Sequence, residues 1–427
     1  MKLKKYAFAV IATTTLACTI ATAATTVEND GKQSKVFPFN PPAKKPNIPL
    51  SSAMIRYYDM FNGKQPYDNE YFTQFKYSEL EGFDYNDFDG TITRRDPSRI
   101  LLHNGKYYMW YTYRHTPVSP KGAKLSTETI PSADWDLAEI WYATSKDGFK
   151  WEEQGVAVAR PPKPQLGHRA VTTCEVLEWE GKFYLYHQAF NVASGTRGDD
   201  CPVSVAVADS PDGPWKHSGK VIIPNGGEGE WDQYSIHDPH PLVRDGKIYL
   251  YYKSDFGQKP DLVRMQGLAI SDNPMGPFVK HPKNPVINSG HETGIIPYGE
   301  GVLALVYKDG PEHNTIQYAK DWVNFEIVAI SEMMPYAASF FMPDATNNGG
   351  DARGTTWGMA HFINYNQNWS KMCSKLVRFD CDLSKDIHDP KMHEPRVMYD
   401  PKVYYQQTLS PAQKKRIAEE NKRLTGK

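Results

Sequence analysis

The sequence predicts an all-β fold, a five-bladed β-propeller with short helical arms at both ends. A repeated unit runs through the middle of the chain: an acidic residue, apolar residues, a Gly-Lys turn and an aromatic strand. A turn-rich stretch with a second aromatic strand follows each copy, as in SKDGFKW and ADSPDGPW. Short strands joined by Asp-Gly and Gly-Pro turns are typical of antiparallel hairpins. Four or five such sheets imply a propeller, which closes radial sheets around a channel.

The repeated unit has four recognisable copies. They read DPSRILLHNGKYYMWYTY, CEVLEWEGKFYLYHQAF, DPHPLVRDGKIYLYYKS and the degenerate ETGIIPYGEGVLALVYKDG. Their turn glycines are Gly105, Gly181, Gly246 and Gly301. A fifth stretch, TTWGMAHFINYNQNWSKMCSKLVRFDCD, keeps the strand pattern without the Gly-Lys turn. We therefore expect the propeller to span residues 66–405.

The first 23 residues resemble a signal peptide. A Lys-rich start and an apolar run precede Ala21-Thr22-Ala23, a small-residue cleavage pattern. We expect removal of residues 1–23 and a periplasmic mature protein, with lipid attachment at Cys18 the weaker alternative. No later segment has the roughly 18 apolar residues of a membrane helix, so no membrane partner is predicted.

Two helical arms flank the predicted propeller. Residues 24–65 contain PLSSAMIRYYDMFNGK, a helix-compatible run after serine caps. Residues 406–427 contain SPAQKKRIAEENKRL, with Ser410 as a cap and Gln413 three residues later. Such short polar helices must pack on the propeller or on a neighbouring subunit.

Charge and cysteine content narrow the function classes. The formal net charge of -1 gives no basic surface, so nucleic acid is not an expected partner. Four cysteines remain after the leader, Cys174, Cys201, Cys373 and Cys381, and their spacing matches no zinc motif. Free or structural thiols are expected, although an oxidising compartment also permits disulfides.

Acidic residues recur at the start of the repeated units. Asp96, Glu175, Asp238 and Glu292 each precede the turn glycine by six to nine residues. The first strand of every blade lines the channel, so these carboxylates should converge at one mouth. Converging carboxylates repel one another and require a counter-charge, a cation or a catalytic use. The alternative is that they cap loops or hold a structural cation.

His291 is a further candidate functional residue, because it stands directly before Glu292. An imidazole beside a channel carboxylate can serve as a general acid. His168, His237, His240 and His361 are weaker candidates, since each could support a loop or hold a water. The sequence carries no HExxH, EF-hand, Walker or nucleophile-elbow motif, which excludes nucleotide and zinc-protease chemistry.

The motifs RRDPS, IHDPHP, GHETG and SSAMIR together resemble glycoside hydrolase family 117, from about residue 45 to the C-terminal helix. The resemblance implies a five-bladed propeller enzyme that removes 3,6-anhydro-L-galactose from the non-reducing end of neoagaro-oligosaccharides. Ser51-x-Ala53-x-x-Arg56 looks like the family's N-terminal motif, carried on an arm that swaps between the subunits of a homodimer.

The resemblance also implies roles for individual residues. Asp96 would be the general base that activates water, and Asp238 would orient substrate or tune the site. Glu292 would complete an acidic trio, with His291 as the general acid. An inverting glycosidase needs such a donor and base on opposite faces of the sugar. Substrate-binding residues are expected to be Arg94, Arg95, Glu175 and His237. No cofactor is required, and a hydrated divalent cation can occupy the channel in the family.

Two alternatives stay open at this point. One is a related propeller glycosidase that acts on another galactan or on arabinan or xylan oligosaccharides, for which three channel carboxylates would also suffice. The other is a non-catalytic periplasmic glycan-binding propeller, in which the acids hold a structural cation.

Overall fold

The computed structural model describes most of the chain. The described residues are 42, 44–59, 69–196, 201–254, 264–343, 350–364 and 372–394, with 415, 418–419 and 421–424. The predicted signal peptide, residues 1–23, and most of the flanking arm to residue 41 lie outside them, as does the Ser410 cap.

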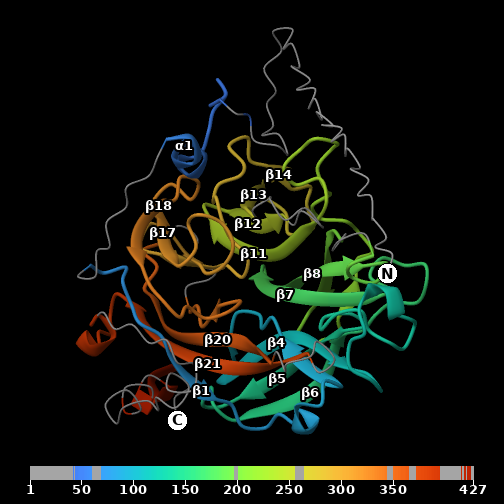
Figure 1. Cartoon of the computed structure of the whole chain (residues 1–427). Coiled ribbons are helices and arrows are strands. Elements are labelled where there is room, and N and C mark those ends of the chain that lie inside the picture. The colour runs from blue at the N-terminus through green and yellow to red at the C-terminus, as the bar shows by residue number, and fades with distance from the viewer. Residues whose placement is uncertain are drawn as a thin grey trace, which may run out of the picture. The chain divides into compact units, whose positions relative to one another are not determined.

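The described residues form five antiparallel sheets arranged as the blades of a propeller, which confirms the predicted fold (Figure 1). The first blade has the order β2-β4-β5-β6, with β3 beside β4. Its strands are β2 (Ile92–Arg95), β3 (Leu101–His103), β4 (Lys106–His115), β5 (Glu139–Ser145) and β6 (Trp151–Val158). The second blade has the order β7-β8-β9-β10. Its strands are β7 (Ala170–Trp179), β8 (Lys182–Phe190), β9 (Val203–Ala208) and β10 (Lys216–His217).

The third and fourth blades repeat the same meander. The third consists of β11 (Ile236–Arg244), β12 (Lys247–Ser254), β13 (Gln266–Ser271) and β14 (Val279–Lys280). The fourth consists of β15 (Gly294–Tyr298), β16 (Gly301–Val306), β17 (Thr315–Ala319) and β18 (Glu326–Ile330). The predicted Gly-Lys turns join the first pair of strands in the second and third blades and join β3 to β4 in the first.

The fifth blade joins the two ends of the propeller. It has the order β1-β21-β20-β19, and its strands are β1 (Lys76–Glu79), β19 (Ser339–Phe340), β20 (Gly354–Asn364) and β21 (Cys373–Ser384). β1 pairs antiparallel with β21, with Lys76 opposite Asp380 and Glu79 opposite Val377. An N-terminal strand thus supplies the outer edge of the last blade, so hydrogen bonds close the ring of sheets.

The hydrophobic core consists mainly of five clusters, each shared by two neighbouring blades. Between the first and second blades, for example, buried Trp110 packs with Val171 and Leu185. Each blade is therefore apolar on both faces, which explains the near-continuous apolar and aromatic strands in the sequence. The four cysteines after the leader are all buried.

Short helices cover the outside. They are α1 (Ser52–Tyr58) and the 3₁₀ turns η1 (Asn86–Phe88), η2 (Ala123–Leu125) and η4 (Pro390–Met392). Helix α1 lies in the predicted N-terminal arm, and the described residues of the C-terminal segment are also helical. In that segment Asn421 donates a hydrogen bond to the carbonyl oxygen of Asp147 (2.9 Å) and accepts one from the Tyr107 hydroxyl (2.7 Å). No helix in the described part of the chain is long and apolar enough to cross a membrane.

Helix α1 explains the Ser-x-Ala-x-x-Arg spacing. The Ser51 hydroxyl accepts a hydrogen bond from the Met54 amide and donates one to the carbonyl oxygen of Pro285 (2.6 Å). Ala53 and Met54 are fully buried against the second and third blades. Arg56 forms an ion pair with Glu312 on the fourth blade (2.8 Å). One turn of helix thus places a cap, a small buried residue and a cation on one binding surface.

Candidate active site

A ring of five residues, one from each blade, surrounds the channel with left-handed backbone conformations. Asp96, Thr173, Asp238, Glu292 and Ala337 have φ values of 48°, 42°, 48°, 63° and 50°, and all five line the same narrow cavity. Two of these positions coincide with register shifts, in β7 and β11. Such a conformation costs a non-glycine residue on the order of 1–3 kcal/mol and is concentrated at functional sites. The ring is therefore the first structural indication of an active site.

A wider pocket opens above this ring. Its lining is mostly charged or hydrogen-bonding: Arg95, Asp96, Trp135, Thr173, Gln188, His237, Asp238, Lys253, Arg264, His291, Glu292, Lys308, Tyr336, Ile363 and Met372. The structure thus brings the four predicted catalytic residues together, with Arg95 and His237 from the predicted substrate-binding set. A pocket of cations, carboxylates and aromatic rings suits a polyhydroxylated ligand.

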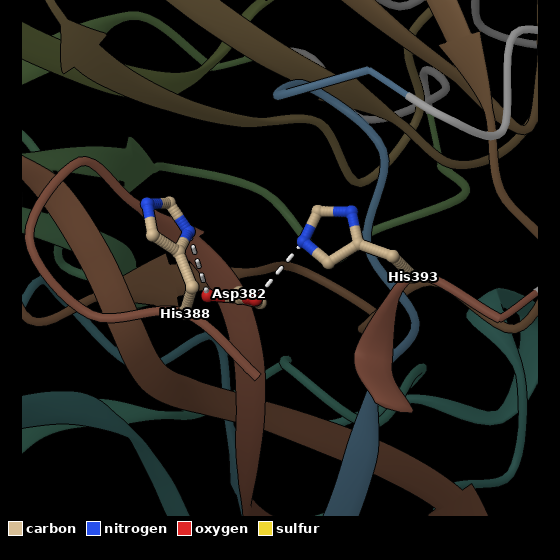
Figure 2. A group of neighbouring side chains, drawn as sticks. All are labelled: Asp382, His388 and His393. Atoms are coloured by element: carbon tan, nitrogen blue, oxygen red, sulfur yellow. Dashed lines mark hydrogen bonds and ion pairs between the residues drawn. The ribbon is translucent and has the colours of Figure 1, made fainter. Parts of the chain in front are cut away.

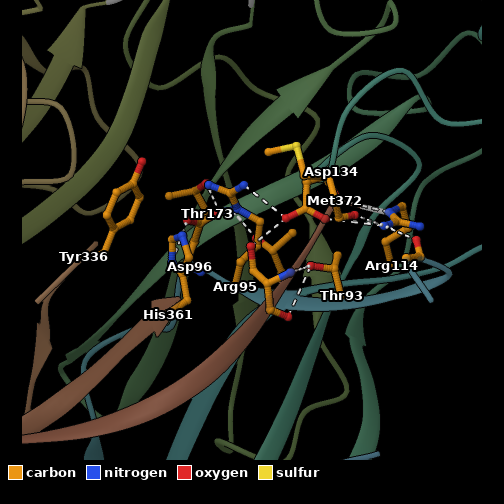
Figure 3. A network of polar contacts seen from close by, with 12 residues as sticks. Thr93, Arg95, Asp96, Arg114, Asp134, Thr173, Tyr336, His361 and Met372 are labelled. Carbon is orange, nitrogen blue, oxygen red and sulfur yellow. Dashed lines mark hydrogen bonds and ion pairs between the residues drawn. The ribbon is translucent and has the colours of Figure 1, made fainter. Parts of the chain in front are cut away.

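Asp96 lies at the centre of a buried polar network (Figure 3). Its Oδ2 atom accepts hydrogen bonds from Arg95 Nε (2.9 Å) and from the Thr173 hydroxyl (3.1 Å). The backbone N–H of Asp96 donates to Nδ1 of His361 (3.2 Å), and Oδ1 lies 3.5 Å from the same nitrogen. Because Nδ1 accepts this bond, the ring proton of a neutral His361 resides on Nε2. The Oδ1 atom is therefore the oxygen of Asp96 that is left to interact with a ligand.

Arg95 is the counter-charge of the site. Its guanidinium contacts Asp96, the buried Asp134 (3.4 Å) and Glu292 (4.0 Å). Burial lowers the pKa of Arg95, but these three carboxylates outweigh burial and raise it, so the group stays charged. Burial and the Arg95 charge lower the pKa of His361, which keeps this imidazole neutral.

Asp238 and Glu292 are held as anions by nearby cations. Lys253 on β12 contacts Asp238 Oδ2 (2.7 Å). Burial raises the pKa of Asp238, but the Lys253 charge and hydrogen bond bring it below its usual value. Burial likewise raises the pKa of Glu292, but the hydrogen bond and charge of His291 hold it well below its usual range. Neither carboxyl group can act as a proton donor near neutral pH.

His291 lies between two carboxylates. Its Nε2 atom is 3.0 Å from Glu292 Oε1, and its Nδ1 atom is 3.1 Å from Asp309 Oδ2. Arg264 also binds Asp309 and approaches Nδ1 of His291 (3.3 Å). The hydrogen bond from His291 lowers the pKa of Asp309. With a carboxylate oxygen near each nitrogen, the ring has a fixed orientation between Glu292 and Asp309.

Two predicted substrate-binding residues do not reach the pocket. Arg94 points away from Arg95 and forms an ion pair with Glu153 on β6 (2.8 Å), because successive side chains of a strand lie on opposite faces. Glu175 lies deeper in the channel, where its carboxylate accepts hydrogen bonds from the backbone N–H (3.1 Å) and Nε (2.9 Å) of Arg99. The ring position of the second blade is held by Thr173, which stands at the register shift in β7 as Asp238 does in β11, and Glu175 lies two residues further along the strand.

Several pocket residues were not singled out from the sequence. They are Trp135, Thr173, Gln188, Lys253, Arg264, Lys308, Tyr336, Ile363 and Met372. Lys253 and Gln188 follow the Gly-Lys turns on the second strands of their blades, so the repeat itself offered a signal for them. Lys308 donates to the Tyr336 hydroxyl (3.3 Å), and no carboxylate among the described residues is paired with it.

A tightly ligated cation does not fit this site well. Donor atoms of Asp96, Glu292 and His361 lie within 4.8 Å of one another, a spacing that a metal could span. The Arg95 guanidinium, however, is already bound to Asp96 and contacts Glu292, so a metal ion would have to displace it. Nδ1 of His361 is also engaged by the Asp96 amide. Arg95 and Lys253 are therefore the positive charges that face the carboxylates of this site.

The comparison with solved structures assigns the chain to a family. A family 117 glycoside hydrolase of the marine bacterium Zobellia galactanivorans, Zg3597, is 56% identical, with a TM-score of 0.75. The match covers 80% of this chain and 100% of that protein. The chain belongs to glycoside hydrolase family 117. It is thus a glycoside hydrolase, and the non-catalytic alternative is set aside.

More distant members of the same fold differ in sequence. The profile "Glycosyl hydrolases family 43" matches residues 127–261 of this family 117 protein. BT0996, solved as an RGII complex, is 14% identical over 72% of this protein and 91% of its own length, with a TM-score of 0.52. A further glycoside hydrolase is 14% identical, with a TM-score of 0.50. The match covers 73% of this protein and 92% of that one. These two likenesses establish the fold alone. No curated protein sequence matches the chain.

Proposed function

We propose that this family 117 enzyme is an exo-acting hydrolase that removes 3,6-anhydro-L-galactose, α-1,3-linked, from the non-reducing end of neoagaro-oligosaccharides. The observation that carries the proposal is that one pocket is lined by two kinds of group. Asp96 offers a carboxylate oxygen as a base, and His291 offers a proton, while the other two acids are held ionised. An inverting glycosidase requires one general base and one general acid of this kind.

Asp96 is the proposed general base. Its Oδ2 atom is occupied by Arg95 and Thr173, which fixes the carboxylate plane and leaves Oδ1 for a water molecule. As the water oxygen bonds to the anomeric carbon, one water proton passes to Oδ1. The glycosidic C–O bond breaks in the same step, and inversion of the anomeric carbon follows from attack on the opposite face.

His291 is the proposed general acid. Its Nε2 proton passes to the departing glycosidic oxygen, and Glu292 holds the ring in place before that transfer. The positive charge that develops on the sugar ring is stabilised by the ionised carboxylates of Asp238 and Glu292. Lys253 fixes the orientation of Asp238, and Lys308 and His237 lie in the pocket wall as donors for sugar hydroxyls.

The test is a product assay with the mature chain. Purified wild-type enzyme is incubated with neoagarobiose and neoagarotetraose, and the release of 3,6-anhydro-L-galactose is followed by chromatography beside the Asp96→Asn variant. Release by the wild type alone supports both the substrate and the base, and proton NMR of the first product gives the anomeric outcome. If neither protein releases the sugar, the anhydrogalactosidase proposal fails. A panel of other galactan, arabinan and xylan oligosaccharides then identifies the substrate of the same site.

We also propose that the enzyme works as a homodimer through its N-terminal arm and is exported to the periplasm. The arm contacts made by Ser51, Ala53 and Arg56 would be the same on a partner subunit, so exchange of the arm costs little. Deletion of residues 24–60 should yield monomers in light scattering, and an unchanged mass would refute the exchange. N-terminal sequencing of the secreted protein checks cleavage after Ala23.

A further inference from the structure

A second cluster of metal-ligating side chains lies outside the active site, where the two ends of the propeller meet. Asp382 is on β21, His388 is in the loop that follows, and His393 comes directly after η4. The Asp382 amide donates to the Thr73 hydroxyl (2.7 Å), and the Gln74 amide donates to the carbonyl oxygen of Met392 (2.7 Å). The cluster therefore joins the last long strand to the segment just before β1.

The three side chains converge on one point. Both imidazole rings face the Asp382 carboxylate (Figure 2). His393 Nε2 lies 2.9 Å from Oδ2, and His388 Nδ1 lies 3.8 Å from Oδ1. One donor atom from each residue lies within 4.8 Å of the other two. Ligands at Zn–N and Zn–O distances of about 2.1 Å stand roughly 3.4 Å apart around a tetrahedral ion. The two observed separations, each to a different oxygen of Asp382, lie on either side of this value.

Within the described part of the chain, the Asp382 carboxylate has only histidines as possible counter-charges. Its side chain is only 2% exposed, and no lysine or arginine among the described residues is paired with it. The Asp389 amide donates to Oδ2 (2.6 Å), which orients the carboxylate but brings no charge. Buried carboxylates are normally paired with a cation or bound to a metal. Among the described residues, the two imidazoles are in a position to balance the charge of Asp382, either directly or through an ion that both of them bind.

We propose that Asp382, His388 and His393 bind a divalent transition-metal ion of the zinc type. Two imidazole nitrogens and one carboxylate oxygen suit Zn²⁺, whereas Mg²⁺ and Ca²⁺ prefer oxygen ligands alone. The hydrogen bond from the Asp389 amide is an outer-shell contact of the kind that orients metal ligands. His388 is 61% exposed, so solvent can reach the site and supply the fourth ligand.

The bound ion would link β21 to the loop and the 3₁₀ turn that follow it, beside the segment that precedes β1. A ligand that binds only the folded protein raises its stability by mass action. Zinc should therefore raise the melting temperature through this site, with no requirement for activity. The site is separate from the pocket of Asp96 and Glu292, which lies at the inner strands of the blades.

The experiment measures zinc binding and zinc-dependent stability. Chelator-treated, dialysed full-length mature protein is titrated with ZnCl₂ by calorimetry, and thermal unfolding is followed with and without the ion. The variants are His388→Ala and His393→Ala, and the control is His115→Ala, an exposed histidine at the end of β4. Circular dichroism without zinc checks that each variant folds. Since His388 is mostly exposed, its variant should fold normally.

The wild type and His115→Ala should show one zinc-binding event and a higher melting temperature with zinc. Removal of either cluster histidine should weaken that event about tenfold or more and abolish the stabilisation, because even the loss of an outer-shell partner costs about tenfold. The event should persist in Asp96→Asn. Absence of zinc binding by the wild type, or unchanged affinity in His388→Ala, would overturn the proposal.

Discussion

The pocket ring and the deeper channel layer hold buried carboxylates in different ways. In the ring, Asp96 and Glu292 both contact the guanidinium of Arg95, and no charged donor among the residues that the structure describes contacts Oδ1 of Asp96. One layer deeper, Glu175 is enclosed by Arg99, which donates from both its backbone and its side chain, with His240 at 3.8 Å. In the sequence pattern, Asp96, Glu292 and Glu175 are all the acidic residue that begins a repeated unit.

The difference indicates that a buried carboxylate can take part in catalysis when its hydrogen-bond and ionic partners leave one of its oxygens available. A carboxylate with a full set of partners resists a ligand, because the ligand would have to replace strong hydrogen bonds. A carboxylate that shares its counter-charge retains an oxygen that can accept a proton. The ring should therefore control turnover, and the deeper layer should control stability.

The largest expected effect is on turnover in Asp96→Asn. The amide cannot accept a proton, so kcat should fall by about 10²–10⁴ or more, the usual contribution of general-base catalysis. The measurement is initial rate on the oligosaccharide that the wild type cleaves fastest, with the melting temperature recorded for both proteins. Activity within tenfold of wild type would remove Asp96 from the role of base.

Replacement of His291 by Asn should give a loss that depends on the leaving group. Against natural oligosaccharides, kcat should fall by about 10²–10⁴, because the departing alkoxide needs a proton. An activated aryl glycoside of the same sugar leaves without protonation, so the loss there should be much smaller. Equal losses on both substrates would show that His291 positions the substrate and does not donate the proton.

Glu175→Gln should show the reverse pattern from Asp96→Asn. Loss of one partner of a buried ion pair leaves Arg99 uncompensated and typically costs about 3–5 kcal/mol. We expect a lower free energy of unfolding in urea, with kcat close to that of the wild type in the folded enzyme. A wild-type stability combined with a large loss of kcat would place Glu175 in the catalytic machinery.

The lowered pKa values set a pH window for stability. Glu175, Asp238 and Glu292 all have folded pKa values below those of an unfolded chain, near 3.9 for Asp and 4.3 for Glu. Their contribution is fully present above about pH 4.3 and is lost as pH falls through the folded values, at up to about 1.4 kcal/mol per pH unit for each group. Urea unfolding between pH 3 and 6 should show this slope, and Glu175→Gln should flatten it. Equal slopes in both proteins would contradict the assigned shift.

The smallest expected effect is that of Thr173→Val. The substitution keeps the β-branched shape and removes the hydroxyl that donates to Asp96 Oδ2. Loss of one such bond is worth about 1 kcal/mol, or roughly fivefold in kcat/KM. An unchanged kcat/KM would indicate that Arg95 alone fixes the carboxylate.

The architecture could be predicted because the repeat is strong. Turn glycines, Asp-Gly hairpins and continuous aromatic strands specify four blades directly, and the fifth follows from its strand pattern. The closure by β1 (Lys76–Glu79) could not be predicted, because four residues at the edge of a sheet carry no periodic signal and their partner strand lies some 300 residues away.

The site was predictable only where the repeat sets the register. Asp96, Asp238 and Glu292 occupy equivalent ring positions, so alignment of the repeats brought them together. Glu175 lies outside the ring because it stands six residues before Gly181, whereas Thr173 stands eight residues before it, the same spacing as Asp238 to Gly246. Arg94 and Arg95 could have been separated by strand alternation, which sends neighbouring side chains to opposite faces.

The central claim is that Asp96, whose pairing leaves Oδ1 available, does chemistry, while Glu175, which is enclosed by Arg99, supports the fold. The most direct test is the turnover number of Asp96→Asn and Glu175→Gln, measured side by side on the same oligosaccharide under conditions where both are folded. We predict a loss of at least about 10² for Asp96→Asn and a change of less than about threefold for Glu175→Gln. Similar losses in the two variants would contradict the claim.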